Sequence, residues 1–349
     1  MFSVTLFHHG IFILVPSVIS TSTHLLTYRQ KLRGVMDLFS PYTSHAQTAL
    51  CAPVKDKYSL LMEDDKVRVG ASSMQGWRNS MEDAHTIHLS LPNLPFHMAP
   101  EDGAMAAVFD GHSGCKTAQF AASHMLKWIT SSDLFASGNI EAAIRSAFVR
   151  GDAVIHRSMP YEQSGCTGNC ILLVQNHLYC SNVGDSRAVM CRGGVPFPLS
   201  EDHKPTLPKE RERIKKAGCF VQNGRVNGVL SLSRALGDFS FKDQGLKPEE
   251  QAISPVPDVV HVTLTPQDEF VIIACDGVWE KLSNKKVINF VRDEIGEHGD
   301  LSLACERLMD FCLAPVAGSP GSDNMTVVIV QFKSIFLRKL ESEFVCTHV

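Results

Sequence analysis

Alternating apolar and polar positions predict that much of the chain forms short β-strands. Within residues 66–72, the apolar Val67, Val69 and Ala71 share one side. Residues 83–91 alternate in the same way, and a period of two residues is typical of a strand. Further short apolar runs, each bounded by turn residues, predict strands at 103–109, 169–174, 178–183, 188–191, 259–264, 269–275 and 324–332.

Other segments show the spacing of an α-helix. Ala118, Ala121 and Met125 recur along one face of residues 115–130, and residues 139–157 follow the same pattern. Shorter helices are predicted at 207–217, 283–295 and 301–313. Two clusters of strands with helices between them predict an α+β fold. We expect a central β-sandwich of two antiparallel sheets that is flanked by α-helices.

The same patterns divide the chain into three parts. Residues 1–65 lack periodicity and are predicted to be a poorly ordered N-terminal extension. Residues 66–334 are dense in predicted elements and show no internal boundary, which indicates one domain. Residues 335–349 are expected to form a short C-terminal tail.

The beginning of the chain leaves three interpretations open. Residues 1–27 contain no charged side chain other than histidine, and the first basic residue, Arg29, follows the apolar stretch instead of preceding it. A secretory signal has the opposite order, and Pro16 interrupts a membrane span. The segment is a poorly ordered extension, a weak membrane anchor, or upstream translation before a start at Met36, and the first and third are favoured over the anchor.

Composition excludes several classes of function and suggests a compartment. The 349 residues carry a net charge of −4, and no basic run is longer than a pair such as Lys215-Lys216, so a nucleic-acid partner is not expected. The 11 cysteines include no C-x-x-C pair, which argues against zinc and indicates reduced thiols. We therefore expect a cytoplasmic or nuclear protein, with a membrane-anchored form as the alternative, and a monomer by default.

Three acidic residues lie at the ends of predicted strands. Asp110 follows the apolar run that ends at Phe109, Asp276 follows the run that ends at Cys275, and Asp323 precedes the last strand. In antiparallel neighbours, the end of one strand lies beside the start of the next, so the three carboxylates can converge at one sheet edge.

Three carboxylates at one edge would repel one another unless cations lie between them. Ligands that offer only oxygen favour a hard metal, Mg²⁺ or Mn²⁺. The glycines that follow Asp110 and Asp276 allow a tight turn and the approach of a backbone carbonyl. A single Asp-Gly pair is most often a turn, but several at apolar strand ends predict a metal centre.

Two further acidic sites are ambiguous when each is considered alone. Asp185 lies in the sequence Gly-Asp-Ser-Arg, which is also typical of a hairpin turn. Arg78 precedes Glu82 and Asp83 by four and five residues, which is also the spacing of a surface salt bridge.

Eight motifs, in order, resemble the metal-dependent protein serine/threonine phosphatases known as protein phosphatase type 2C. The resemblance covers about residues 66–334. The motifs are Gly76–His85, Phe109–Gly114, Asn182–Arg187, Glu201–Pro205, Arg225–Gly228, Ser233–Asp238, Ala274–Trp279 and Gly321–Thr326.

The resemblance implies hydrolysis of phosphoserine and phosphothreonine in phosphoprotein substrates at a centre of two Mg²⁺ or Mn²⁺ ions, with a weaker third. By this likeness Asp110 bridges the two ions, the Gly111 carbonyl binds one, and Asp276 and Asp323 bind the other. The remaining expected metal residues are Glu82 and Asp83, which hold metal-bound waters, and Asp185, at the third position.

The resemblance also implies residues that handle the substrate. Arg78 would bind the phosphate, because a guanidinium can contact two oxygens at once, and His112 would protonate the leaving alcohol. The residues expected to contact substrate or to lie in a flap beside the site are Arg225, Asn227, Gly228 and Asn324.

The chain departs from the family's pattern at two positions, and three other functions compete. Gly168 stands where the family usually has alanine, and Cys219 where it usually has glycine. Cys219 and Arg225 fit the C-x₅-R pattern of cysteine-dependent phosphatases, but no histidine precedes the cysteine. An inactive relative used for binding, and another two-metal hydrolase such as a nuclease, are the remaining alternatives.

Overall fold

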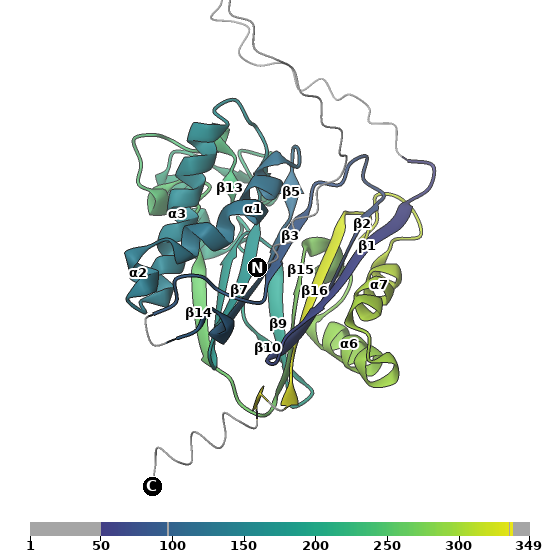
Figure 1. Cartoon of the computed structure of the whole chain (residues 1–349). Coiled ribbons are helices and arrows are strands. Elements are labelled where there is room, and N and C mark those ends of the chain that lie inside the picture. Colours follow the sequence, from purple (N-terminus) through teal and green to yellow (C-terminus); the bar gives the residue numbers. More distant parts are fainter. Residues whose placement is uncertain (1–49, 96–97, 335, 338–349) are drawn as a thin grey trace, which may run out of the picture. The chain divides into compact units, whose positions relative to one another are not determined.

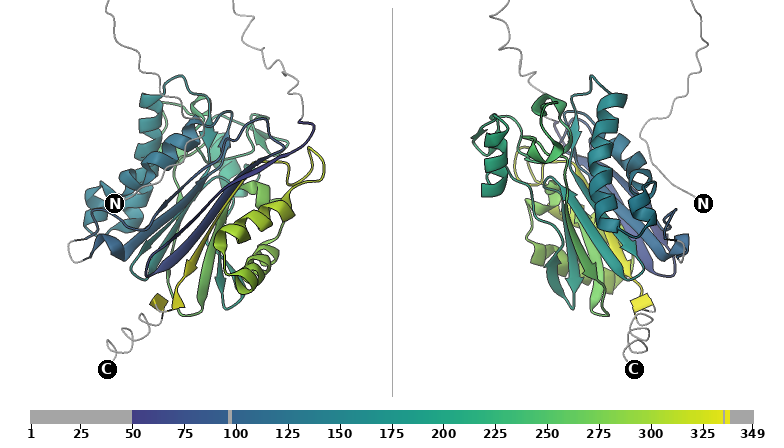
Figure 2. Two further views of the ribbon diagram at one scale, coloured as in Figure 1. Left: turned by 45° about the vertical axis from the view of Figure 1, so that its right-hand side comes forward. Right: turned by 90° about the vertical axis from the view of Figure 1, so that its left-hand side faces the viewer.

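The structure is a computed structural model that describes residues 50–95, 98–334 and 336–337. Within these residues, two antiparallel sheets pack face to face, and helices cover both outer faces, giving four layers (Figure 1). This arrangement confirms the α+β sandwich predicted from the sequence. Figure 2 shows the same layers from two further sides.

The larger sheet has six strands and the smaller has five. The six-stranded sheet has the order β1 (Val54–Glu63), β2 (Val67–Gly76), β16 (Met325–Phe332), β15 (Asp268–Ala274), β9 (Arg187–Arg192) and β10 (Val195–Pro198). The five-stranded sheet has the order β14 (Asp258–Thr263), β8 (His177–Val183), β7 (Gly168–Val174), β4 (Gly103–Phe109) and β3 (Ala84–His88).

Two smaller sheets lie outside the sandwich. One has three very short strands in the order β13 (Leu236–Gly237), β6 (Gly165–Cys166) and β5 (Gly111–His112). The other is a hairpin of β11 (Val221–Gln222) and β12 (Arg225–Val226). The α-helices are α1 (Lys116–Thr130), α2 (Asp133–Ala136), α3 (Ile140–Ser158), α4 (Pro208–Lys216), α5 (Asp276–Trp279), α6 (Asn284–His298) and α7 (Leu301–Cys312).

Alternating side chains of the central strands divide the core into layers. In β4, Ala106 and Val108 face the other sheet, whereas Ala107 and Phe109 face α1 and α3. In β15, Ile273 likewise lies between the sheets. Because both faces of these strands are buried, their sequences read as continuous apolar runs.

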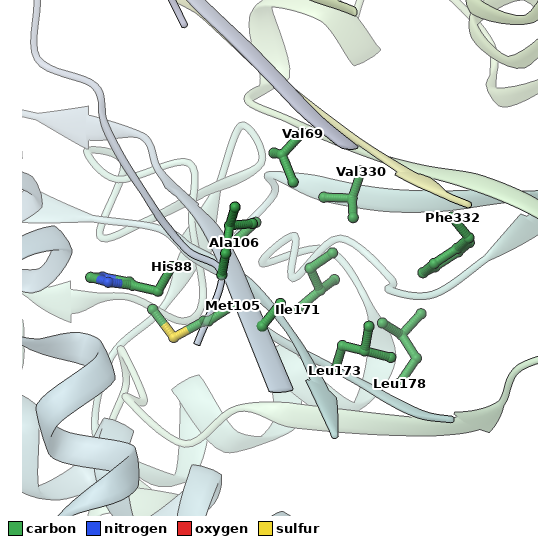
Figure 3. A pocket seen from close by; sticks show the side chains of 11 residues that line it. Val69, His88, Met105, Ala106, Ile171, Leu173, Leu178, Val330 and Phe332 are labelled. Carbon is green, nitrogen blue, oxygen red and sulfur yellow. The ribbon is translucent and has the colours of Figure 1, made fainter. Parts of the chain in front are cut away.

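Figure 3 shows the layer between the two sheets. Val69 and Val330 extend from the six-stranded sheet toward Ala106, Ile171 and Leu173 of the five-stranded sheet. These side chains leave only a small apolar space between them. The two sheets are therefore held at a fixed separation by close packing.

Strand β1 differs from the sequence-based expectation. Residues 54–63 were assigned to the N-terminal extension, but they pair with β2 as the edge strand of the six-stranded sheet. Tyr58 and Leu61 are 47% and 46% exposed, so the strand has no fully buried face. An edge strand of this kind lacks the apolar alternation on which the prediction relied.

The location predicted from the sequence needs correction. No helix among residues 50–95, 98–334 and 336–337 is long and apolar enough to cross a membrane. The segment on which the anchored alternative rested, residues 1–27, lies outside the described residues. The prediction of a location is withdrawn.

A buried ion network holds the chain segment that contains α4 and links β10 of one sheet to β14 of the other. Glu210 is 3% exposed and accepts hydrogen bonds from Arg213 (2.6 Å), Arg234 (2.7 Å) and the Ser233 hydroxyl (2.8 Å). Burial alone would raise the pKa of Glu210, but Arg234 and Arg213 outweigh it and lower that pKa to about 2.

Replacing Phe148 tests the helix-facing core. Phe148 is fully buried on α3, and a Cβ at Gly168 would lie 3.0 Å from its ring, so the space around it is tightly filled. We expect Phe148→Ala to lower the free energy of unfolding by about 3–5 kcal/mol in urea titrations. Tyr161, which is 92% exposed, is the matched aromatic control. Tyr161→Ala should change the free energy of unfolding by less than about 0.5 kcal/mol. Equal losses in the two variants would contradict this packing.

The Glu210 network should give a defined pH dependence of stability. Because the folded pKa of Glu210 lies below the unfolded value, its contribution is present above about pH 4.5 and is lost as the pH falls toward 2. Glu210→Gln should therefore be less stable than the wild type at pH 7, and the difference should shrink between pH 5 and pH 3. Urea unfolding across this range measures the difference, and a constant gap would refute the assignment.

Candidate metal centre and active site

Five strands from the two sheets end around one acidic cluster. Asp110 follows β4, Asp185 lies in the turn between β8 and β9, and Asp276 begins α5 just beyond β15. One carboxylate oxygen from each of these three residues lies within 4.8 Å of the other two. Asp323 precedes β16, the neighbour of β15 in the six-stranded sheet. The structure thus brings Asp110 and Asp276 together, with Asp185 as the third member of the group in place of Asp323, which strand polarity had predicted there.

Burial and mutual repulsion govern the charges of this cluster. Burial is the main cause that raises the pKa of Asp110 well above its usual value, and the charges of Asp83 and Asp276 raise it further. Burial likewise raises the pKa of Asp276, with added repulsion from Asp185 and Asp323. Without protons or cations, the cluster would hold several unneutralised charges in a low-dielectric environment.

Asp83 supplies a direct test of whether a metal fits. Its side chain is buried, and the Thr326 hydroxyl donates to Oδ2 at 2.8 Å. Oδ1 is also buried but has no hydrogen-bond partner among the residues that the structure describes. Burial raises the pKa of Asp83 to about 7, against the hydrogen bond from Thr326. An unpartnered buried carboxylate oxygen beside other carboxylates fits a hard divalent cation or water bound to one.

Thr167 fixes the backbone at Asp110. Its hydroxyl accepts from the Asp110 N–H at 3.0 Å, and its own N–H donates to the Asp110 carbonyl at 2.9 Å. The same hydroxyl lies 2.7 Å from the hydroxyl of Ser186, next to Asp185. One threonine therefore sets the separation of two members of the cluster.

The glycines that follow two of the aspartates allow close packing of backbones. A Cβ at Gly111 would lie 2.1 Å from the Glu82 carbonyl oxygen, and one at Gly277 would lie 2.5 Å from the Asn324 carbonyl oxygen. Neither glycine has a positive φ, so neither is needed for a left-handed turn. The sequence-based explanation of a tight turn is replaced by close approach, which draws the segment with Glu82 and Asp83 against the cluster.

Two basic side chains reach the rim of the cluster. Arg78 forms a salt bridge with Asp323, and Lys204 forms one with Asp185. The Arg78 side chain is 60% exposed, so its guanidinium is accessible from solvent. The sequence predicted a role at the site for Arg78 but none for Lys204, although Lys204 lies within the motif Glu201–Pro205.

Asn324 does not face a substrate as expected. It is 4% exposed, and its side-chain oxygen accepts from the Glu82 N–H at 2.8 Å. Its amide nitrogen donates to the carbonyls of Gln75 and Ser80 at 2.8 and 3.0 Å. Asn324 therefore positions the loop that carries Arg78 and Glu82.

Arg225, Asn227 and Gly228 lie on a separate hairpin. Arg225 donates to the Val229 carbonyl at 2.8 Å, and Asn227 hydrogen-bonds within residues 219–227. Asn227 and Gly228 have φ of 51° and 74°, as a turn requires. The Arg225 guanidinium donates its hydrogen bond to the Val229 carbonyl, and the Cys219 thiol is contacted by Asn227 instead. The hairpin therefore does not place a guanidinium beside a thiol, as a cysteine-dependent phosphatase requires.

His112 has a partner that sequence reasoning missed. Its Nε2 lies 2.8 Å from both carboxylate oxygens of Asp238. Burial would lower the pKa of His112, but the charge and hydrogen bond of Asp238 outweigh burial and raise it. The sequence does hold one sign of this partner, because Asp238 directly follows the short apolar run of residues 235–237, as Asp110 follows its own apolar run.

Comparisons with known proteins agree with this geometry. The family model described as protein phosphatase 2C matches residues 67–319. Protein phosphatase 2C homolog 2 of Hypocrea jecorina is 45% identical over 290 residues, which are 81% of this chain and 66% of that relative. Protein phosphatase 2C homolog 2 of Schizosaccharomyces pombe is 44% identical over 289 residues, covering 81% of this chain and 78% of that relative.

A solved structure is also similar. The crystal structure of a phosphatase from a pathogenic strain of Toxoplasma gondii superposes with a TM-score of 0.68 at 29% identity, covering 80% of this chain and 96% of the other. The matched residues 67–319 include Asp110, Asp185 and Asp276 and the rim residues Arg78 and Lys204, whereas β1, β16 and Asp323 lie outside this range. The chain therefore belongs to the protein phosphatase 2C family.

Proposed function

We propose that the chain is a protein serine/threonine phosphatase that hydrolyses phosphoserine and phosphothreonine in proteins with a metal-activated water. Membership of the protein phosphatase 2C family supports a metal-dependent phosphatase. The observation that carries the assignment to this site is the partly buried cluster of Asp110, Asp185 and Asp276, in which one carboxylate oxygen of each residue lies within 4.8 Å of the others.

The oxygen-only donors favour Mg²⁺ or Mn²⁺, with two ions at the centre. Such ions, when bound, supply neutralising charge and a more acidic water for in-line attack on phosphorus. Asp110 would be shared between the two ions, and Asp276 and Asp323 would hold one of them. The other proposed metal residues are Gly111, through its carbonyl, Glu82 and Asp83, through waters, and Asp185, at a weaker third position.

The proposed handling of the phosphate rests on Arg78 and His112. The exposed guanidinium of Arg78 can bind two phosphate oxygens, and its salt bridge with Asp323 orients it toward the cluster. His112 would give a proton to the leaving oxygen of serine or threonine as the P–O bond breaks.

The hairpin with Arg225, Asn227 and Gly228 would act as a flap that contacts the phosphoprotein. Phe220, which precedes this hairpin and is 56% exposed, offers an apolar contact for a peptide. Residues 66–334, together with the edge strand β1, would form the catalytic domain. One chain supplies every proposed ligand, so a monomer would suffice, and no nucleic-acid partner is proposed.

Removal of the metal or of its ligands tests the proposed function. With Mn²⁺, the wild type should dephosphorylate a phosphothreonine peptide, and Asp110→Ala and Asp276→Asn should abolish this activity. Mn²⁺ at 100 times its Kd should stabilise the wild type by about 2.7 kcal/mol but not the variants, as thermal unfolding would measure.

The control for these variants is Asp310→Asn, an exposed aspartate on α7 that should keep both the activity and the stabilisation. EDTA should abolish the activity, whereas iodoacetamide should not. A folded wild type that is inactive with Mn²⁺, or active in EDTA, would contradict the proposal.

Lys204 should limit binding of the third cation. Burial raises the pKa of Asp185, and the Lys204 ammonium opposes this rise by neutralising the carboxylate. Because a metal ion at Asp185 competes with this ammonium, Lys204→Met should tighten the weakest class of Mn²⁺ sites about tenfold, or about 1.4 kcal/mol. Free Mn²⁺ measured by electron paramagnetic resonance reports the affinities. Lys116→Met, which removes an exposed lysine paired with Glu162, is the control, and an unchanged weak site in Lys204→Met would reject the competition.

A further inference from the structure

His112 and Asp238 form a partly buried, hydrogen-bonded pair. Nε2 of His112 is 2.8 Å from each carboxylate oxygen of Asp238. The Asp238 side chain is 5% exposed, whereas His112 is 24% exposed. The carboxylate therefore lies at the buried edge of the imidazole ring, and part of the ring is still accessible to solvent.

The three-stranded sheet brings these two residues together. In the order β13-β6-β5, Gly165 of the central strand pairs with Gly237 on one side and with His112 on the other. A Cβ at Gly165 would lie 2.2 Å from Asp238 Oδ2 and 2.5 Å from His112 Nε2. The two side chains can meet across the central strand only because residue 165 is glycine.

The backbone of Asp238 is held in an uncommon conformation. Its φ and ψ are 52° and 41°, in the left-handed region, which costs a non-glycine residue about 1 kcal/mol or more. The surrounding contacts maintain this conformation. The Asp238 N–H donates to the Ser164 carbonyl at 3.3 Å, and the Gly237 N–H donates to Asp152 at 2.8 Å.

Asp152 is itself fixed by an ammonium. Lys242, 5% exposed, donates to Asp152 Oδ1 at 2.8 Å and to the Ala235 carbonyl at 3.1 Å. These hydrogen bonds support the backbone on both sides of Asp238, and none of them involves a residue of the acidic cluster. Their structural effect is to direct one carboxylate at one ring nitrogen.

We propose that Asp238 is a positioning residue for His112, accepting the Nε2–H and leaving Nδ1 to transfer the proton. This inference rests on the proposed function. As the attacking water loses a proton to solvent and forms its bond to phosphorus, the ester P–O bond breaks and its electron pair goes to the leaving oxygen. That oxygen takes the proton from Nδ1, while Nε2 keeps its proton in the hydrogen bond to Asp238. A buried carboxylate that holds one histidine nitrogen in this way fixes both the tautomer and the ring orientation.

The dependence on the leaving group distinguishes this role from a structural one. The alcohol of serine or threonine is a poor leaving group and needs a proton, whereas p-nitrophenolate leaves readily as an anion. Loss of a positioned proton donor should therefore slow the first kind of ester much more than the second. A residue that only supports the fold or the metal centre would affect both esters alike.

The experiment compares Asp238→Asn and Asp238→Ala in the full chain at saturating Mn²⁺. We expect kcat for a phosphothreonine peptide to fall about 100-fold, within the range for lost general-acid catalysis, with little change in KM. For p-nitrophenyl phosphate, kcat should fall by less than about threefold, since little proton transfer is needed there. Combined with His112→Gln, the Asp238 variants should cause no further loss, because residues that act as a unit are not additive.

Two further variants complete the design. Asp243→Asn, on the exposed loop after Asp238, is the matched control and should leave both rates unchanged. Gly165→Ala keeps Asp238 but places a methyl group between the partners, and it should reproduce the selective loss. Mn²⁺-dependent thermal stabilisation, measured for each variant, reports that the fold and metal centre are intact.

The possible failures can be told apart. If His112→Gln slows both esters equally, the proton-transfer role in the proposed function is wrong, and the inference falls with it. If His112→Gln is selective but the folded Asp238 variants and Gly165→Ala are not, the inference alone is overturned. Selective loss in all of them supports it.

Discussion

Repulsion among closely spaced, partly buried carboxylates is the constraint around which this site is built. Asp110 and Asp276 lie within 4.8 Å of each other and of Asp185, and burial already raises the pKa of each. At the rim, the protein supplies its own cations, since Lys204 is paired with Asp185 and Arg78 with Asp323. No lysine or arginine in the described part of the chain forms a salt bridge with Asp110 or Asp276. The centre of the cluster is therefore left to an external cation, while the rim is neutralised by side chains that a substrate or a third ion could displace.

The second constraint is the close approach of backbones, which glycine permits at three places. Gly111 lies against the Glu82 carbonyl, Gly277 against the Asn324 carbonyl, and Gly165 between His112 and Asp238. In each case a methyl group would come within about 2.5 Å of a neighbouring atom, a distance at which the chain must shift. These glycines act through the space that they leave empty, because none of the three has a positive φ.

Periodicity in the sequence predicted the layers of the fold but not every member of them. The strands buried on both faces and the helices that cover them were found from apolar runs and helical spacing, since burial imposes those patterns. β1 was missed because an edge strand with exposed faces carries no such pattern. At the site, strand polarity brought Asp110 and Asp276 together, but the pairings of Lys204 with Asp185 and of His112 with Asp238 could not be read from the sequence. The two residues of these pairs are 19 and 126 positions apart, and charge alone does not tell which partners the fold will bring together.

The position of the site at the end of both sheets makes its geometry depend on the core between them. Asp110 follows a strand of the five-stranded sheet, whereas Asp276 follows one of the six-stranded sheet. Two residues before Asp110, Val108 packs in the same cluster as Ile273, which lies three residues before Asp276. A small sliding of one sheet over the other would change the separation of the carboxylates directly, although every strand could stay intact. Because packed interiors resist such sliding, the apolar layer between the sheets fixes the distances that a pair of cations needs.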